Sequence, residues 1–219
     1  MSKIPIYFMP GLAAGPEIFY NLNLDLTLYK LHYLSWKPPL EMEESISNYA
    51  VRMTAEIKHE KPILIGVSFG GIIVQEMSKL INTEKIIIIS SVKSTSELPK
   101  RYKIAGKSKI YKLFPTQIVT NFENYSKFFI GKSLQKKSKM YEKYLSVRGK
   151  DYIKWSIRTV VYWRQDKPLE NIIHIHGTDD NIFPFKRIKN CIKIEYGNHS
   201  MIILKAKQIS QIIHESLTC

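Results

Sequence analysis

Cysteine is scarce in this sequence, and no long apolar run or low-complexity stretch occurs in it. The two cysteines, Cys191 and Cys219, are too few and too scattered for a disulfide framework or a zinc cluster. No apolar run approaches the roughly 20 residues that a membrane-spanning helix needs, and no signal peptide precedes the first expected strand. These absences predict a cytoplasmic protein without a transmembrane segment.

Acidic residues are also scarce, with 19 Asp and Glu against 33 Lys and Arg, and the imbalance is concentrated in one segment. Between Lys93 and Lys150 lie 15 basic and three acidic residues, which carry +12 of the formal net charge of +14. A basic excess confined to one segment favours an anionic partner on that side, although a solvated helical face has the same composition. Nucleic acid is not expected, because no known binding motif accompanies the charge.

Short apolar runs alternate with helical patterns along the 219 residues, which predicts a parallel sheet covered by helices on both faces. Strands are expected near residues 3–9, 28–34, 62–67, 85–91, 171–176 and 191–196. Helices are expected near residues 43–59, 69–81, 151–165 and 205–216. The fold class is therefore α/β, with a sheet of about six strands.

A GxSxG motif, GVSFG at residues 66–70, directly follows the apolar run Pro62–Ile65. Residues Ile72 to Leu80 have a helical pattern, so the chain must turn from strand to helix within a few residues. Such a turn crowds the backbone, and the glycines on either side of Ser68 remove the side chains that would clash. The Ser68 side chain then points away from the sheet, where a nucleophile can reach a substrate.

A serine nucleophile needs a base and a group that orients the base, and two later loops offer candidates. His199 lies in the sequence YGNHSM, and Asp179 and Asp180 end the sequence HGTDD. Taken singly, a loop aspartate or a surface histidine has an ordinary structural explanation. Three such motifs at the ends of three expected strands predict a catalytic site, because α/β sheets bind ligands at that edge.

His174 and His176 alternate along the expected strand near 171–176 and so share one face of it. No third ligand accompanies them, and the pattern is typical of structural histidines. No metal site and no cofactor are expected.

The order of nucleophile, acid and base along the chain resembles that of the α/β-hydrolase superfamily. The resemblance extends from about residue 3 to about residue 216, apart from one insertion. In this family the acid is usually the third residue after the glycine of a His-Gly pair, with a proline four residues further on. Gly177, Asp180 and Pro184 match that spacing, so the resemblance favours Asp180 as the acid, with Asp179 as the alternative.

The resemblance also implies an oxyanion hole made of two backbone N–H groups. One belongs to Phe69, which follows the nucleophile, and the other to Leu12, in the loop after the first strand. The histidine that usually precedes the first glycine of this loop is Pro10 here. The donors are backbone groups and are expected to survive this change, each lowering the barrier by roughly 3 kcal/mol.

Residues 92–150 interrupt the alternation of strands and helices at the place where family members insert a lid. The core is accordingly expected at residues 1–91 and 151–219, and a helical lid at 92–150 over Ser68. Some of the segment's aromatic rings are expected to line an acyl pocket, and the others to pack the lid against the core. They are Tyr102, Tyr111, Phe114, Phe122, Tyr125, Phe128, Phe129, Tyr141 and Tyr144.

The resemblance implies a serine hydrolase that cleaves a carboxylic ester or thioester through an acyl-enzyme. Serine at the elbow argues against dehalogenase and epoxide hydrolase relatives, which use a carboxylate there. The basic lid suggests an acyl carrier protein, coenzyme A or an anionic lipid surface as the partner. Two alternatives remain: a lyase or C–C bond enzyme that uses the triad as an acid–base device, and a non-catalytic ligand-binding homologue.

Overall fold

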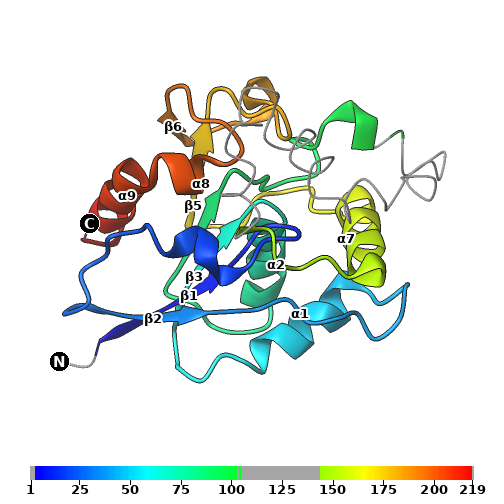
Figure 1. Cartoon of the computed structure of the whole chain (residues 1–219), viewed down its shortest axis with the longest axis horizontal. Coiled ribbons are helices and arrows are strands. Elements are labelled where there is room, and N and C mark those ends of the chain that lie inside the picture. Colours follow the sequence, from blue (N-terminus) through cyan, green and yellow to red (C-terminus); the bar gives the residue numbers. More distant parts are fainter. Residues whose placement is uncertain (1–2, 103, 105–143, 219) are drawn as a thin grey trace.

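The computed structural model describes residues 3–102, 104 and 144–218, which form a six-stranded sheet with helices on both faces (Figure 1). The strands are β1 (Ile4–Met9), β2 (Tyr29–Tyr33), β3 (Ile63–Val67), β4 (Lys85–Ile89), β5 (Ile172–Gly177) and β6 (Ile192–Ile194). Their order across the sheet is β2-β1-β3-β4-β5-β6, and every neighbouring pair is parallel. The prediction of a parallel sheet of about six strands is confirmed, and the carboxyl ends of all strands meet at one edge.

The four expected helices lie close to their predicted positions and differ mainly at their ends, and the short helix α8 was not expected. The helices are α1 (Ile46–Thr54), α2 (Phe69–Ser78), α7 (Lys150–Tyr162), α8 (Met201–Leu204) and α9 (Ala206–Thr218), with 3-10 turns η1 (Pro16–Phe19) and η4 (Phe185–Arg187). Helix α1 begins later than expected because the Ser45 hydroxyl accepts the Asn48 N–H at 3.1 Å and caps the helix. No helix in the described part of the chain is long and apolar enough to cross a membrane.

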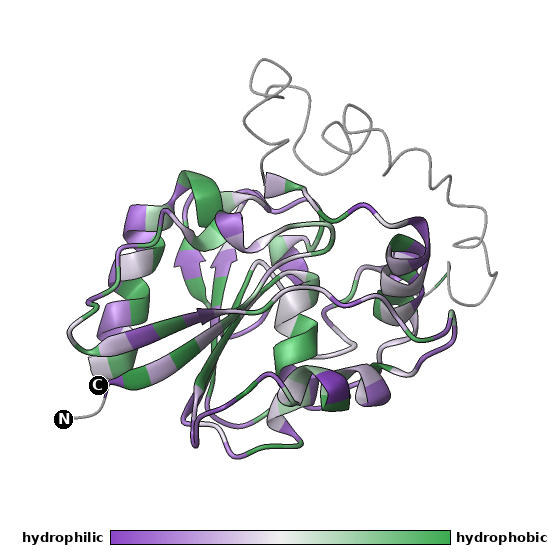
Figure 2. Cartoon of the chain, turned by 60° about the horizontal axis from the view of Figure 1, so that its bottom comes forward, coloured by the Kyte–Doolittle hydropathy of each residue, from purple (hydrophilic) through white to green (hydrophobic). Residues whose placement is uncertain are grey.

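Alternate residues of the strands pack into two separate hydrophobic cores. Tyr7 and Met9 of β1 belong to the core under α1, α2 and α7. Ile6 and Phe8 belong to the core under η1, α8 and α9 on the opposite face (Figure 1). Because both faces are covered, the central strands are almost wholly apolar, with Lys85 at the start of β4 as the exception, while the flanking helices show mixed hydrophobic and hydrophilic colours (Figure 2).

The predicted lid lies mostly outside the described residues, since residues 103 and 105–143 are not among them. Its beginning, as far as Tyr102, is described and packs on the core. Val92 and Leu98 are fully buried in the cluster shared with α1, α2 and α7. This stretch therefore leaves β4 along the core surface before the undescribed part begins.

The sharp turn between β3 and α2 requires glycine at position 70. A Cβ on Gly70 would overlap the carbonyl oxygens of Met9 and Pro10, which are backbone atoms that cannot swing aside. We expect Gly70→Ala to lower the free energy of unfolding by about 2 kcal/mol or more, because the helix must shift away from β1. Denaturant unfolding of the purified variants measures this loss.

Gly149→Ala is the matched control, because the nearest atom to a Cβ there is the Tyr152 Cβ at 3.8 Å, and the φ of Gly149 is −57°. The control is expected to unfold within about 0.5 kcal/mol of the wild type. Equal stability of the two alanine variants would contradict the close contact at Gly70.

Candidate active site

Ser68 lies at the apex of the turn between β3 and α2, in a strained backbone conformation. Its φ of 53° and ψ of −119° are rarely adopted by a residue with a side chain. The neighbouring backbone holds it there, because the Ser68 N–H donates to the Ile89 carbonyl at 2.9 Å. The Ser91 hydroxyl also donates to the Ser68 carbonyl, at 2.7 Å. The turn is thus fixed from β4, the next strand of the sheet.

The His199 imidazole lies between Ser68 and Asp180, and each of its ring nitrogens forms a hydrogen bond with one of these side chains. The distance from His199 Nε2 to Ser68 Oγ is 2.8 Å, and that from His199 Nδ1 to Asp180 Oδ2 is also 2.8 Å. A carboxylate only accepts, so Nδ1 carries the proton and Nε2 is left to accept the Ser68 hydroxyl. The structure therefore brings the three predicted catalytic side chains into one hydrogen-bonded series.

Asp180 is buried, and its carboxylate is saturated with donors. Its Oδ1 accepts the backbone N–H groups of Ile182 at 2.8 Å and Phe183 at 2.9 Å, while Oδ2 accepts His199. Burial raises the pKa of this carboxyl, but the electrostatic interaction and hydrogen bond with His199, together with His176 and the Phe183 N–H, outweigh burial, so its pKa lies below the ordinary value. Asp179, the alternative acid, is exposed, and its carboxylate accepts a hydrogen bond from the Thr178 hydroxyl. Asp180 is the aspartate beside His199.

Two glycines allow the loops that carry Asp180 and His199 to touch. A Cβ on Gly177, at the end of β5, would overlap the carbonyl of Gly197 in the loop after β6. The loops are also joined directly, because the Asp179 N–H donates to the Gly197 carbonyl at 2.9 Å. The glycines of the two sequence motifs thus bring acid and base within reach of each other.

The two predicted oxyanion donors lie on the segments that flank the nucleophile. Phe69 is the first residue of α2, so its N–H has no acceptor within the helix. The loop that carries Leu12 lies against the nucleophile, since a Cβ on Gly11 would be 3.5 Å from the Ser68 Cβ. The segments that carry Phe69 and Leu12 therefore both lie next to Ser68.

Trp36, which no sequence pattern singled out, anchors the loop of Gly11 and Leu12 that is predicted to supply an oxyanion donor (the oxyanion loop). Its indole N–H donates to the Gly11 carbonyl at 2.9 Å, and its ring stacks on Phe69 at 5.0 Å between centroids. A second anchor is the end of the predicted lid segment, where the Val147 N–H donates to the Ala13 carbonyl at 3.0 Å. These contacts hold the loop although the usual histidine is Pro10. A tryptophan after a short strand gave no sequence signal for this role.

A cavity of about 510 Å³ opens beside Trp36, between the loop after β2 and the segment that leads into α7. Its lining includes the aromatic rings of Trp36 and Tyr152, the basic side chains of Lys37, Arg148 and Lys150, and the acidic side chain of Asp151. Trp36 lines this cavity and also binds the oxyanion loop through the Gly11 carbonyl.

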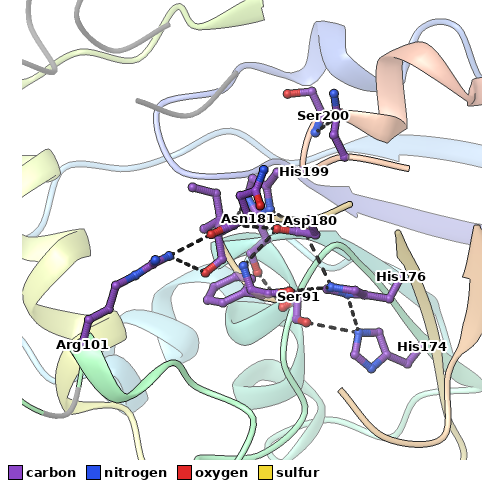
Figure 3. Close-up of polar contacts among 12 residues, drawn as sticks. Ser91, Arg101, His174, His176, Asp180, Asn181, His199 and Ser200 are labelled. Atoms are coloured by element: carbon purple, nitrogen blue, oxygen red, sulfur yellow. Dashed lines mark hydrogen bonds and ion pairs between the residues drawn. The ribbon is translucent and has the colours of Figure 1, made fainter. Parts of the chain in front are cut away.

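The beginning of the predicted lid contacts the acid loop. Arg101 donates to the carbonyls of Asn181 and Ile182 at 3.0 and 2.9 Å (Figure 3). The Tyr102 ring packs on Phe183, which in turn lies edge-on to the His199 imidazole at 5.6 Å. The connection after β4 thus supports the loop that carries Asp180.

No metal site is evident in residues 3–102, 104 and 144–218, where no three His, Cys, Asp or Glu side chains are placed to hold an ion. Cys191 is half-buried and free.

The strained backbone at Ser68 predicts that glycine is more stable than serine at this position. Ser68→Gly removes the Cβ that makes the conformation costly, and we expect its free energy of unfolding to rise by about 1 kcal/mol or more. Ser68→Ala keeps the Cβ and is the matched control, with no comparable gain. Denaturant unfolding compares the three proteins, and a glycine variant no more stable than the alanine variant would argue against strain.

No family model matches the chain, and no curated protein matches it in sequence. Solved structures do match it over nearly its whole length. A carboxylesterase from the thaumarchaeon Nitrososphaera gargenis superposes with a TM-score of 0.74 at 13% identity, covering 99% of this chain and 90% of that one.

Two further solved structures agree with this result. A bromoperoxidase from Bacillus anthracis has a TM-score of 0.71 at 14% identity, covering 100% of this chain and 93% of that chain. An epoxide hydrolase from Bacillus megaterium has a TM-score of 0.71 at 11% identity, covering 100% and 94%. Identities this low establish the fold alone. All three proteins have the α/β-hydrolase fold, and this chain shares it.

Proposed function

We propose that this protein is a serine hydrolase that cleaves a carboxylic ester or thioester through an acyl-enzyme. The observation that carries the proposal is the pair of 2.8 Å hydrogen bonds that join His199 to Ser68 and to Asp180. This is the geometry that lets a histidine take the serine proton while an aspartate holds the correct tautomer. A carboxylesterase among the similar structures is consistent with the proposal.

In the proposed reaction, His199 Nε2 takes the Ser68 proton as the hydroxyl oxygen attacks the substrate carbonyl. Asp180 accepts the Nδ1–H throughout and stabilises the imidazolium that forms. The N–H groups of Leu12 and Phe69 donate to the developing oxyanion. His199 then protonates the leaving alcohol or thiol, and water, activated by the same imidazole, cleaves the acyl-enzyme.

The basic residues suggest a substrate with an anionic portion, such as an acyl chain carried by coenzyme A or by an acidic carrier protein. Lys37, Arg148 and Lys150 line the cavity beside Trp36, which supports such a group on this side of the site. Lys37 already pairs with Glu56, at 2.5 Å. Arg148 also donates to the Leu145 carbonyl, so the proposal for the partner depends largely on basic residues of the segment that lie outside the described residues.

Hydrolysis of p-nitrophenyl esters of increasing acyl length tests the reaction, with wild type and Ser68→Ala side by side. We expect turnover by the wild type and a loss of about 10³-fold or more in kcat for the variant, because the nucleophile is removed. The acyl length that is hydrolysed fastest indicates the length of the acyl pocket. Acyl-CoA thioesters assayed at low and high salt test the anionic portion, whose binding should weaken as salt rises.

A fluorophosphonate probe separates the possible negative results. Labelling of Ser68 without turnover of any ester would favour either an enzyme that accepts only a carrier-bound acyl group or lyase chemistry. Neither labelling nor turnover would refute the hydrolase proposal and leave a binding protein as the remaining interpretation.

The choice of acid is tested by two neighbouring substitutions of the same chemistry. Asp180→Asn leaves the size unchanged but turns the acceptor for the His199 Nδ1–H into an amide, and we expect kcat to fall by about 10³-fold or more. Asp179→Asn is the matched control and is expected to change kcat by less than about twofold, because that carboxylate is exposed. A larger loss of kcat in Asp179→Asn than in Asp180→Asn would instead identify Asp179 as the acid.

A further inference from the structure

Two buried histidines lie side by side behind the candidate site, on the strand that leads to Asp180. The ring nitrogen Nε2 of His174 is 3.2 Å from Nδ1 of His176, and the two rings meet edge to face (Figure 3). His176 Nε2 is 2.8 Å from the Phe183 carbonyl and 3.6 Å from Asp180 Oδ2. His174 Nε2 is also 3.1 Å from the Ser91 carbonyl. The pair therefore connects the acid loop to the segment after β4.

The backbone partners determine which nitrogen of each ring carries the proton. A carbonyl oxygen only accepts, so Nε2 of His174 and Nε2 of His176 must both donate. The Nδ1 of His176 faces the Nε2–H of His174 and must be a bare acceptor. A second proton on His176 would set two N–H groups against each other at 3.2 Å. A second proton on His174 would lie on an Nδ1 that is buried without an acceptor among the described residues.

The network continues to the nucleophile through Ser91. The Ser91 carbonyl accepts from His174, and the Ser91 hydroxyl donates to the Ser68 carbonyl at 2.7 Å. At the other end, His176 binds the carbonyl of Phe183, the residue whose N–H donates to Asp180 Oδ1. The positions of nucleophile and acid are thus linked through hydrogen bonds that do not pass through His199.

We propose that His176, held as a neutral Nε2–H tautomer by His174, is a positioning residue that fixes the acid loop and presents an uncharged N–H dipole to Asp180. The absence of charge is the functional point. A cation 3.6 Å from Oδ2 would compete with His199 for the negative charge of Asp180 and weaken the support for the imidazolium formed in catalysis. The neutral N–H instead donates to the Phe183 carbonyl and so holds the residue whose own N–H binds Asp180 Oδ1, without that competition.

The surroundings keep both rings neutral. Burial lowers the pKa of His174 well below its ordinary value, and the nearby His176 and Lys93 lower it further. Burial also lowers the pKa of His176. The carboxylate of Asp180 raises the pKa of His176 and His199 lowers it further. The effect of Asp180 is too small to reverse the lowering.

Long-range ¹H–¹⁵N spectroscopy of the wild type at pH 7 tests the network directly and does not depend on activity. We expect both histidines to be neutral with the proton on Nε2. An Nδ1–H tautomer or a cation at either position would overturn the proposal.

Kinetics test the positioning role, which rests on the proposed hydrolase function. His176→Leu removes the N–H donor, and we expect kcat per serine titrated with fluorophosphonate to fall about 10- to 100-fold with KM within about twofold. His176→Gln retains an amide N–H near the position of Nε2 and is expected to recover most of kcat. Titrating the reactive serine corrects for any fraction of either variant that does not fold.

Ser210→Ala is the control, because its buried hydroxyl donates to the Ala206 carbonyl at 2.8 Å and lies outside the network. It is expected to lose stability but not kcat. Equal kcat in wild type and His176→Leu, or no recovery in His176→Gln, would overturn the positioning role while the hydrolase proposal stands. A wild type that neither reacts with fluorophosphonate nor turns over esters would refute both proposals.

Discussion

The contact between Gly70 and the end of β1 is the constraint on which the candidate site depends. Because residue 70 has no side chain, α2 begins directly against the carbonyls of Met9 and Pro10. That approach leaves no room for an extended turn, and Ser68 is held at a positive φ. The oxyanion loop starts at the same carbonyl, that of Pro10. One close backbone contact therefore fixes the relative positions of Ser68, the first N–H of α2 and the oxyanion loop.

Two buried carboxylates, Glu97 and Asp180, have pKa values that are shifted in opposite directions. Glu97 accepts backbone N–H groups from Lys93 and Lys189, but burial dominates and raises its pKa. Asp180 is similarly buried, and its pKa is nevertheless lowered. Both accept two backbone N–H groups and have basic neighbours, but Asp180 in addition accepts the short hydrogen bond from His199 Nδ1 and lies near His176. The charge on Asp180 thus depends on the base that it orients, so the two residues stabilise each other.

The sequence was sufficient to predict the sheet and the three site motifs, because both depend on local patterns. Apolar runs predict buried parallel strands, and glycines beside Ser68, Asp180 and His199 mark places where backbones approach closely. The supporting contacts were not predictable, since they join residues far apart in sequence. Trp36 meets Gly11 across 25 positions, and His174 meets Ser91 across 83. Neither partner has a composition that distinguishes it from an ordinary core residue.

The basic segment illustrates the limit of arguing from net charge. Three of its described cations donate to backbone carbonyls of the protein itself. Lys93 binds those of Lys189 and Asn190, Arg101 those of Asn181 and Ile182, and Arg148 that of Leu145. Their charges still contribute to the field around the molecule, but these donors are engaged in holding loops. Part of the positive charge that suggested an anionic partner therefore stabilises the fold instead. Arg101, for example, holds the loop that carries Asp180.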